Sequence, residues 1–123
     1  MIYEVSATIT TAADGTATVY LGTRLRGRVH AIKYAPGTLD TGADLTITGE
    51  TTGVAILTKA NAGTSTVWYY PRAFPNQVTD GTAGATPSED VHVVNERIMV
   101  AVVQGGATLT GTITVYIDAP EYP

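Results

Sequence analysis

One short segment of the chain, residues 39–47, contains residue types in an order that could carry out chemistry. It places the sequence Asp-Thr-Gly-Ala at residues 40–43, after the apolar Leu39 and before a β-branched run. The Asp40 carboxylate can take up or release a proton, the Thr41 hydroxyl can brace a loop around it, and Gly42 lets the backbone approach closely. Whether Asp40 performs this chemistry decides between an enzyme and a protein that acts through its surface.

The Asp-Thr-Gly-Ala motif resembles the catalytic loop of retroviral-type aspartic proteases. The resemblance implies a homodimer in which two facing aspartates share one proton and activate a water, because like charges so close cannot both ionise. That family also has an apolar strand running straight into the aspartate, a glycine-rich flap, and a late apolar-apolar-Gly-Arg segment. Here Pro36-Gly37 precedes the motif, Gly63 is the only glycine at the flap position, and no such late segment follows Ile98. We therefore expect no catalytic residue and interpret Asp40 and Asp44 as solvated turn residues; the protease remains an alternative hypothesis.

The other candidates for chemistry have ordinary explanations. His30 and His92, the only histidines, are far apart in sequence and lack spaced acidic ligands, so we expect no metal site. Asp40 and Asp44 do not have the spacing of a calcium loop, and Ser88 has no histidine in a recognisable nucleophile context. The absence of cysteine excludes disulfides and thiolate metal sites. The sequence thus predicts neither a cofactor nor an enzymatic activity.

The composition predicts an all-β protein with few charges on its surface. Charged residues make up 15% of the 123 residues, and there are 22 threonines against three serines. Threonine favours strands because its branched Cβ fits a pleated sheet. The net charge of −4 argues against a nucleic-acid-binding domain, which normally has a basic face. Arg24, Arg26 and Arg28 alternate with Leu25 and Gly27, which we interpret as a solvated or subunit-facing strand surface.

Apolar and polar residues alternate with a period of two along the chain, and no segment shows a convincing helical period. Strands are expected at residues 2–10, 16–21, 26–34, 44–48, 54–59, 64–70, 98–104 and 108–117. The Asp14-Gly15 turn predicts that the first two strands form a hairpin. The pattern predicts one all-β domain over residues 1–123, an antiparallel β-sandwich or barrel of about seven to nine short strands.

Within these strands the pattern makes finer predictions. On the third strand, His30, Ile32 and Tyr34 are expected to share a face opposite Val29 and Ala31. The nearly continuous apolar run at 98–104 predicts a strand buried on both faces. Gly111 interrupts the alternation of the last strand and is expected to mark a bulge.

Two segments remain outside this regular pattern, and one aromatic run within it is notable. Residues 72–90 form a long loop, and a loop of this length in a small domain is usually functional or mobile. Residues 118–123 form a short C-terminal tail. In the run Trp68-Tyr69-Tyr70, alternation places Tyr69 in the core and leaves Trp68 and Tyr70 at an interface between subunits or strands. A sugar-stacking platform is the alternative interpretation of these aromatic residues.

The chain also contains a series of segments in a characteristic order and spacing: Gly27-Arg28-Val29 with Ala31-Ile32, Asp44-Leu45-Thr46-Ile47-Thr48, Trp68-Tyr69-Tyr70-Pro71-Arg72, Asn95-Glu96-Arg97-Ile98 with Val100 and Val102, Gly105, and Thr110-Gly111-Thr112-Ile113-Thr114-Val115-Tyr116-Ile117. In this order they resemble a family of small head-associated structural proteins of tailed double-stranded DNA phages. The resemblance covers residues 27–117 and implies a minor capsid or decoration protein. That family has a turn-rich, variable loop at the position of Asp40-Thr41-Gly42, which gives this tripeptide a structural explanation.

The main hypothesis is therefore a non-enzymatic virion protein that binds the major capsid protein on the outside of the phage head as a homo-oligomer, expected to be a trimer. Contacts are expected at Trp68, Tyr70, Arg72 and Phe74 and along the loop to Asp90. We expect such a protein to be made in the host cytoplasm and to have no membrane partner, because the chain has neither an export signal nor an apolar run long enough to span a bilayer. The net charge of −4 leads us to expect no nucleic-acid partner. The alternatives are a neck or tail structural protein, an aspartic protease acting through Asp40-Thr41-Gly42, and a virion carbohydrate-binding module.

Overall fold

The computed structural model describes residues 1–119, and these contain strands and their connections but no helix. The strands are β1 (Ile2–Thr10), β2 (Ala17–Ala35), β3 (Asp44–Gly49), β4 (Ala55–Lys59), β5 (Val67–Tyr69), β6 (Arg72–Ala73), β7 (Glu89–Val103) and β8 (Thr110–Asp118). They pair antiparallel in the order β1-β8-β2-β7-β3-β4, with β5 added beside β2 and β6 beside β7. The predicted all-β fold is confirmed, and the sheet does not close into a barrel.

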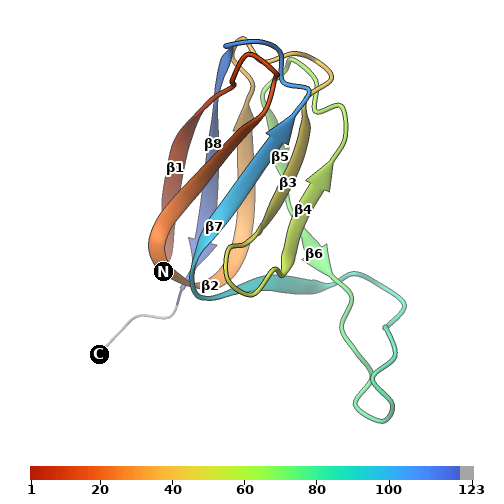
Figure 1. The fold of residues 1–123 in the computed structure, drawn as a ribbon. Coiled ribbons are helices and arrows are strands. Elements are labelled where there is room, and N and C mark those ends of the chain that lie inside the picture. The colour runs from red at the N-terminus through yellow and green to blue at the C-terminus, as the bar shows by residue number, and fades with distance from the viewer. Residues whose placement is uncertain (120–123) are drawn as a thin grey trace.

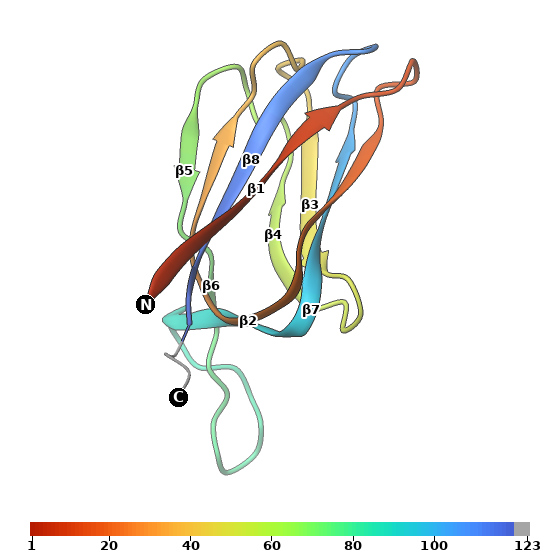
Figure 2. The ribbon, with the colours of Figure 1, turned by 90° about the vertical axis from the view of Figure 1, so that its left-hand side faces the viewer.

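The long strand β2 joins the two layers of a β-sandwich. Residues 17–29 of β2 pair with β7, whereas residues 28–35 pair with β8. One layer therefore contains β1, β8, the second half of β2 and β5, and the other contains the first half of β2, β7, β3 and β4. Figures 1 and 2 show these layers lying face to face.

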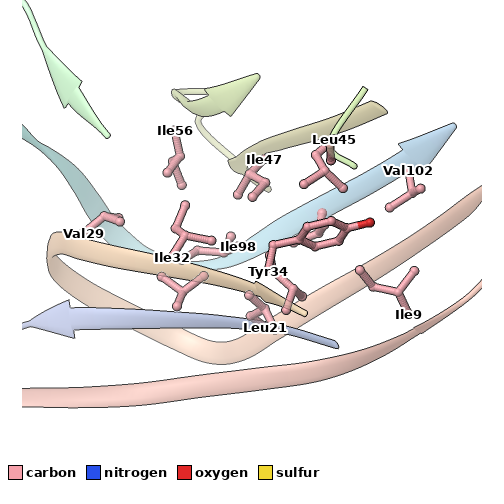
Figure 3. Packing of buried hydrophobic residues seen from close by; sticks show 14 of the residues in the cluster. Ile9, Leu21, Val29, Ile32, Tyr34, Leu45, Ile47, Ile56, Ile98 and Val102 are labelled. Atoms are coloured by element: carbon pink, nitrogen blue, oxygen red, sulfur yellow. The ribbon is translucent and has the colours of Figure 1, made fainter. Parts of the chain in front are cut away.

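Alternation along the strands places one set of side chains between the layers. On β8, Ile113, Val115 and Ile117 are fully buried, while Thr112 and Thr114 lie on the outer face. Side chains from both layers meet around Tyr34, as Figure 3 shows. Burying an aliphatic side chain of this size contributes about 1.5–3 kcal/mol, so the alternation predicted from the sequence also stabilises the fold.

The predicted hairpin between the first two strands is wrong. β1 pairs with β8 along its whole length, from Ile2 opposite Asp118 to Thr10 opposite Thr110. The turn itself forms, because the Asp14 carboxylate accepts hydrogen bonds from the Thr16 backbone N–H at 3.1 Å and from its hydroxyl at 2.8 Å. However, this turn joins strands of different layers. The strands expected at 16–21 and 26–34 are a single strand, β2.

The predicted faces of β2 around His30 are also wrong. The pairing of β2 with β8 shifts by one residue between Val29 and Ala31, so His30 lies in a bulge and is exposed. A single extra residue reverses the alternation that follows it. As a result Val29 points into the core on one side of the bulge, and Ile32 and Tyr34 do so on the other.

Two further expectations differ from the structure. In β7, Ile98, Val100 and Val102 are buried, but the residues between them are half-buried and Val103 is exposed, so only one face of the strand is covered. Gly111 does not mark a bulge, because the register of β8 is continuous through it. A Cβ on Gly111 would lie 2.7 Å from Leu39 Cδ1, so close packing explains the glycine.

The expected tail is shorter than predicted. Asp118 belongs to β8, and the Ala119 backbone N–H donates to the Met1 carbonyl oxygen at 2.9 Å. Both residues are therefore part of the folded domain. The rest of the expected tail, residues 120–123, lies outside the described residues.

Candidate interaction surfaces

The long loop forms an ordered projection rather than an irregular connection. We call residues 74–88 the arm. Asn76 and Ala83 form a β-bridge, the Gln77 N–H donates to the Thr82 carbonyl at 2.7 Å, and the Gly84 N–H donates to the Pro75 carbonyl at 2.7 Å. Figures 1 and 2 show the arm extending away from the body of the sandwich. Its internal hydrogen bonds give it a defined shape without support from the layers.

Almost every side chain of the arm is exposed. Within residues 74–88 the exceptions are Pro75 and Gly84, which are half-buried and lie against each other. Phe74 is 52% exposed and Val78 is fully exposed. Apolar side chains on an ordered projection are unfavourable in water, so the arm is a candidate contact surface.

Arg72 anchors the base of the arm. Its Nε lies 3.1 Å from Asp90 Oδ1, and its Nη1 donates to the carbonyl oxygens of Pro71 at 2.7 Å and His30 at 3.4 Å. Arg72 and Ala73 pair with Asp90 and Glu89 to form the short β6–β7 ladder. Of the four expected contact residues, Arg72 is thus the one whose polar groups are used within the chain.

Asp80 shapes the tip of the arm. Its Oδ1 accepts hydrogen bonds from the Thr82 backbone N–H at 3.1 Å and from the Thr82 hydroxyl at 2.8 Å. These hydrogen bonds hold the pKa of the Asp80 carboxyl below its usual value. The tip therefore carries a negative charge beside the exposed Val78.

Trp68 lies on the outer face of the layer that contains β1 and β8. Its ring stacks on Tyr116 with centroids 5.3 Å apart and planes at 28°, and Lys33 Nζ lies 5.7 Å from its centroid. Burial and the neighbouring Glu4 carboxylate raise the pKa of the Tyr116 phenol. We call Trp68, Tyr116, Lys33 and Glu4 the aromatic face. Trp68 remains 44% exposed there, which leaves part of its ring available to a partner.

The neighbours of Trp68 follow the predicted alternation. Tyr69 is half-buried and packs against the core, where burial raises the pKa of its phenol. Tyr70 is 62% exposed, beyond the end of β5. The structure therefore places Trp68, Tyr70 and Phe74 on the surface but on different elements: the aromatic face, the end of β5 and the start of the arm.

A groove of about 670 Å³ is lined in part by Met1. Figure 1 shows the N-terminus near the end of the sandwich from which the arm extends. The groove is lined by Met1, Arg26, Gly27, Arg28, His92, Val93, Val94, Asn95, Asp118 and Ala119. Gly27 is needed in this wall, because its φ is 131° and a Cβ there would lie 2.6 Å from the Asp118 carbonyl oxygen. Two of the three arginines predicted to form a basic surface, Arg26 and Arg28, thus line one concave site, and Arg24 is also exposed.

The segment around Asp40 is a hydrogen-bonded connection at the edge of the core. The Asp40 N–H donates to the Gly105 carbonyl at 3.0 Å, and its own carbonyl accepts from the Ala43 N–H at 3.1 Å. Leu39 and Ala43 are buried while Asp40 is exposed. The prediction that Asp44 is a solvated turn residue is wrong: Asp44 begins β3, is half-buried, and its carboxylate accepts a hydrogen bond from the Asn61 N–H at 2.9 Å. The backbone and the apolar neighbours of Asp40 therefore form the turn.

The outer face of the other layer has a charged cluster that sequence reasoning missed. The Arg97 guanidinium pairs with both carboxylate oxygens of Glu50, with an Nε–Oε1 distance of 2.8 Å, and lies 4.1 Å from the Tyr20 ring centroid. The hydrogen bonds from Arg97 lower the pKa of the Glu50 carboxyl. These residues come from β2, β7 and the β3–β4 turn. No local sequence signal connects them.

The described residues do not bring metal-binding side chains together. Among residues 1–119, no group of three or more His, Asp or Glu side chains is arranged to hold a metal ion. His92 faces Glu89 at 3.6 Å, whereas His30 lies in the β2 bulge. No helix in this part of the chain could cross a membrane.

Comparison of the chain with protein-family models, with curated proteins and with solved structures found no match. The candidate surfaces are therefore interpreted from their own geometry and from the sequence.

Proposed function

We propose that this protein is a non-enzymatic structural protein of a tailed-phage virion, which binds the outside of the head as a homo-oligomer, expected to be a trimer. Its partners in this proposal are the major capsid protein and further copies of itself. The location on the virion comes from the resemblance over residues 27–117. The geometry supports the more general part of the proposal, a protein that acts through contact surfaces.

The arm is the observation that carries the proposal. It is ordered by its own hydrogen bonds, its base is fixed by the ion pair between Arg72 and Asp90, and it presents Phe74 and Val78 to solvent. A contact element that is ordered before binding loses little conformational entropy when it docks. An exposed, preformed arm is therefore well suited to a permanent assembly.

The outer faces of the sandwich also suit protein contact. Thr8 lies opposite Thr112 and Ser6 opposite Thr114 on the outer face of the β1–β8 pair, so this surface has hydroxyl groups and few charges. Removing hydroxyl groups from water costs less than removing charges. This hydroxyl-rich strip, next to Glu4 and Lys33 on the same face, is compatible with burial against a capsid surface.

The test is binding of the purified full chain to phage heads that lack it, measured by co-sedimentation, with a map of the decorated particle to locate the chain. In the test variant, Asn-Gly replaces residues 74–88 and closes the β6–β7 ladder between Ala73 and Glu89. We expect the wild type to bind and the armless variant to lose most binding while keeping its β-type circular dichroism spectrum. The matched control is Asp14→Lys, which alters a turn far from the arm.

Failure of the wild type to bind heads would contradict the proposal. A map that places the chain at the neck or tail would favour the alternative of a neck or tail structural protein.

The aromatic face supports a second candidate function, carbohydrate binding. The exposed part of Trp68 offers an apolar surface to a sugar ring, and Lys33 and Glu4 next to it could form hydrogen bonds with hydroxyl groups. A glycan array tests this directly. Saturable binding that is lost in Trp68→Ala and kept in Tyr20→Ala would favour the carbohydrate-binding function over head binding.

A further inference from the structure

We propose that the tip of the arm of one copy binds in the groove of a second copy, so that the copies join head to tail. The proposal rests on the proposed function, from which it takes the homo-oligomer, and it names the two surfaces that build it. The arm extends away from its own body, so its tip is available to a neighbouring copy.

Charge favours this pairing. Asp80 is the only charged residue within 74–88. The groove is lined by Arg26 and Arg28, and its one acidic lining residue, Asp118, has its Oδ1 3.4 Å from the Met1 ammonium group. His92, also in the lining, faces Glu89 at 3.6 Å. Arg28 therefore gives the lining a positive charge opposite in sign to that of Asp80 at the tip.

Apolar groups and size also match. Val78 at the tip is fully exposed, and Val94 in the groove is 56% exposed. Docking would cover both side chains and bring Asp80 toward Arg28. The groove volume of about 670 Å³ falls within the range of roughly 300–1,000 Å³ typical of pockets that hold a small ligand. A four- or five-residue turn is an occupant of suitable size.

The symmetry of the oligomer follows from the difference between the two contact surfaces, the tip of the arm and the groove. A contact between unlike surfaces is heterologous, and repeating it forms a closed ring when the rotation closes. Each copy in a ring gives one arm and receives one. A closed ring of three copies would be the expected trimer, built from one kind of contact.

The first experiment is charge reversal, with the mass of the purified full chain in solution measured by light scattering and sedimentation. We expect an oligomer for the wild type and at least ~10-fold weaker association for Asp80→Lys and for Arg28→Glu, because each places like charges together. The double variant should recover association. The matched control is Asp14→Lys, since Asp14 accepts the same pair of hydrogen bonds from Thr16 that Asp80 accepts from Thr82.

The second experiment is a disulfide cross-link. The chain contains no cysteine, so only the introduced cysteines can form a disulfide. In the presence of oxidised glutathione, Val78→Cys combined with Val94→Cys should give covalent oligomers that dithiothreitol reduces to monomers. Val78→Cys combined with Val103→Cys, at the far end of β7, should remain uncross-linked. Cross-linking confined to single chains would overturn the proposal.

Three other results would decide the matter. A monomeric wild type that still binds heads would overturn this inference together with the homo-oligomer, and would leave only the head-binding part of the proposed function. Oligomers that depend on Asp80 and Arg28 but do not bind phage heads would support the inference and contradict the proposed function. Ala119 lines the groove and is followed in the sequence by residues 120–123, so a variant that lacks these four residues is a further test. Association lost on their removal but kept in Asp80→Lys would overturn the proposal.

Discussion

Glu96 in β7 is bound to Thr52, 44 residues earlier, through both of its carboxylate oxygens. Oε1 accepts a hydrogen bond from the Thr52 backbone N–H at 2.9 Å, and Oε2 accepts one from its hydroxyl at 2.7 Å. Oε1 also accepts from the Thr51 N–H at 2.7 Å. Glu96 is only 4% exposed, so a buried carboxylate fixes the β3–β4 turn to the neighbouring strand.

Replacing Glu96 with Gln should lower the free energy of unfolding at pH 7 by about 1.5–3 kcal/mol, because an amide presents only one acceptor to these donors and loses the charge. Urea unfolding measures the loss. The control is Glu4→Gln on the aromatic face, which should change stability by less than about 0.5 kcal/mol. Equal losses in the two variants would show that the buried carboxylate has no special role.

The same carboxylate should make stability depend on pH. Burial acts to raise the pKa of Glu96, but the hydrogen bonds from Thr52 and Thr51 outweigh it and hold the pKa below the ordinary value of 4.5. Its contribution is therefore fully present above about pH 4.5 and is lost as the pH falls through the lower folded-state value. The stability difference between wild type and Glu96→Gln should shrink over that range, as urea unfolding at successive pH values would reveal. A constant difference would contradict this assignment.

Tyr34→Phe should leave the protein equally stable or stabilise it by about 1 kcal/mol, because the Tyr34 hydroxyl is buried without a hydrogen-bond partner among the described residues. Burial, with a smaller contribution from Tyr69, raises the pKa of this phenol, so it stays protonated. Thermal and urea unfolding measure the effect. Tyr70→Phe, at an exposed position, serves as the neutral comparison. A loss above about 1 kcal/mol in Tyr34→Phe would point to a partner for the hydroxyl.

Tyr116→Ala should red-shift the tryptophan fluorescence, because Trp68 is the only tryptophan and loses the ring stacked on it. The lost aromatic pair should also cost about 0.5–1.5 kcal/mol of stability beyond the lost burial. Tyr20→Ala in the opposite layer should leave the emission unchanged. An identical spectrum in Tyr116→Ala would mean that Trp68 does not rest on Tyr116 in solution.

Asp40→Asn should leave folding and self-association within about 0.5 kcal/mol of the wild type, because the backbone of Asp40 holds the turn and its side chain is exposed. The neighbouring Leu39→Ala should cost about 2–5 kcal/mol, since Leu39 is buried. Peptide cleavage with an acid optimum in the wild type, abolished by Asp40→Asn, would establish the protease hypothesis instead.

Local alternation predicted the buried faces of individual strands, whereas pairing partners depended on distant residues. Ile113, Val115 and Ile117 could be assigned to the core because each is flanked by polar residues. The partner of β1 could not be assigned, because an Asp-Gly turn is compatible both with a hairpin and with a change of layer. Simple alternation did not allow for the bulge at His30, so Val29 was placed opposite Ile32 and Tyr34, whereas all three point into the core.

The candidate surfaces, too, were predicted where they depend on local sequence and missed where they depend on distant residues. Exposure of Trp68 and Tyr70 followed from alternation around Tyr69, and the length of the segment after Pro71 indicated an unusual loop. That the loop is an ordered arm depends on backbone hydrogen bonds, which residue types do not specify. The groove brings together residues from both ends of the described chain, and the contact between Glu96 and Thr52 spans separate turns. The groove and the Glu96–Thr52 contact form only when the two layers pack together, so neither could be predicted from local sequence.

The pairing of β1 with β8 has a consequence for how the protein is made. Ile2 lies opposite Asp118, so β1 and its ladder partner among the described strands are separated in the sequence by all of β2 to β7. Contacts of such long sequence separation raise the contact order and slow folding. We therefore expect the β1–β8 ladder to form only after β8 has been synthesised, so that this layer of the sandwich is completed late in folding.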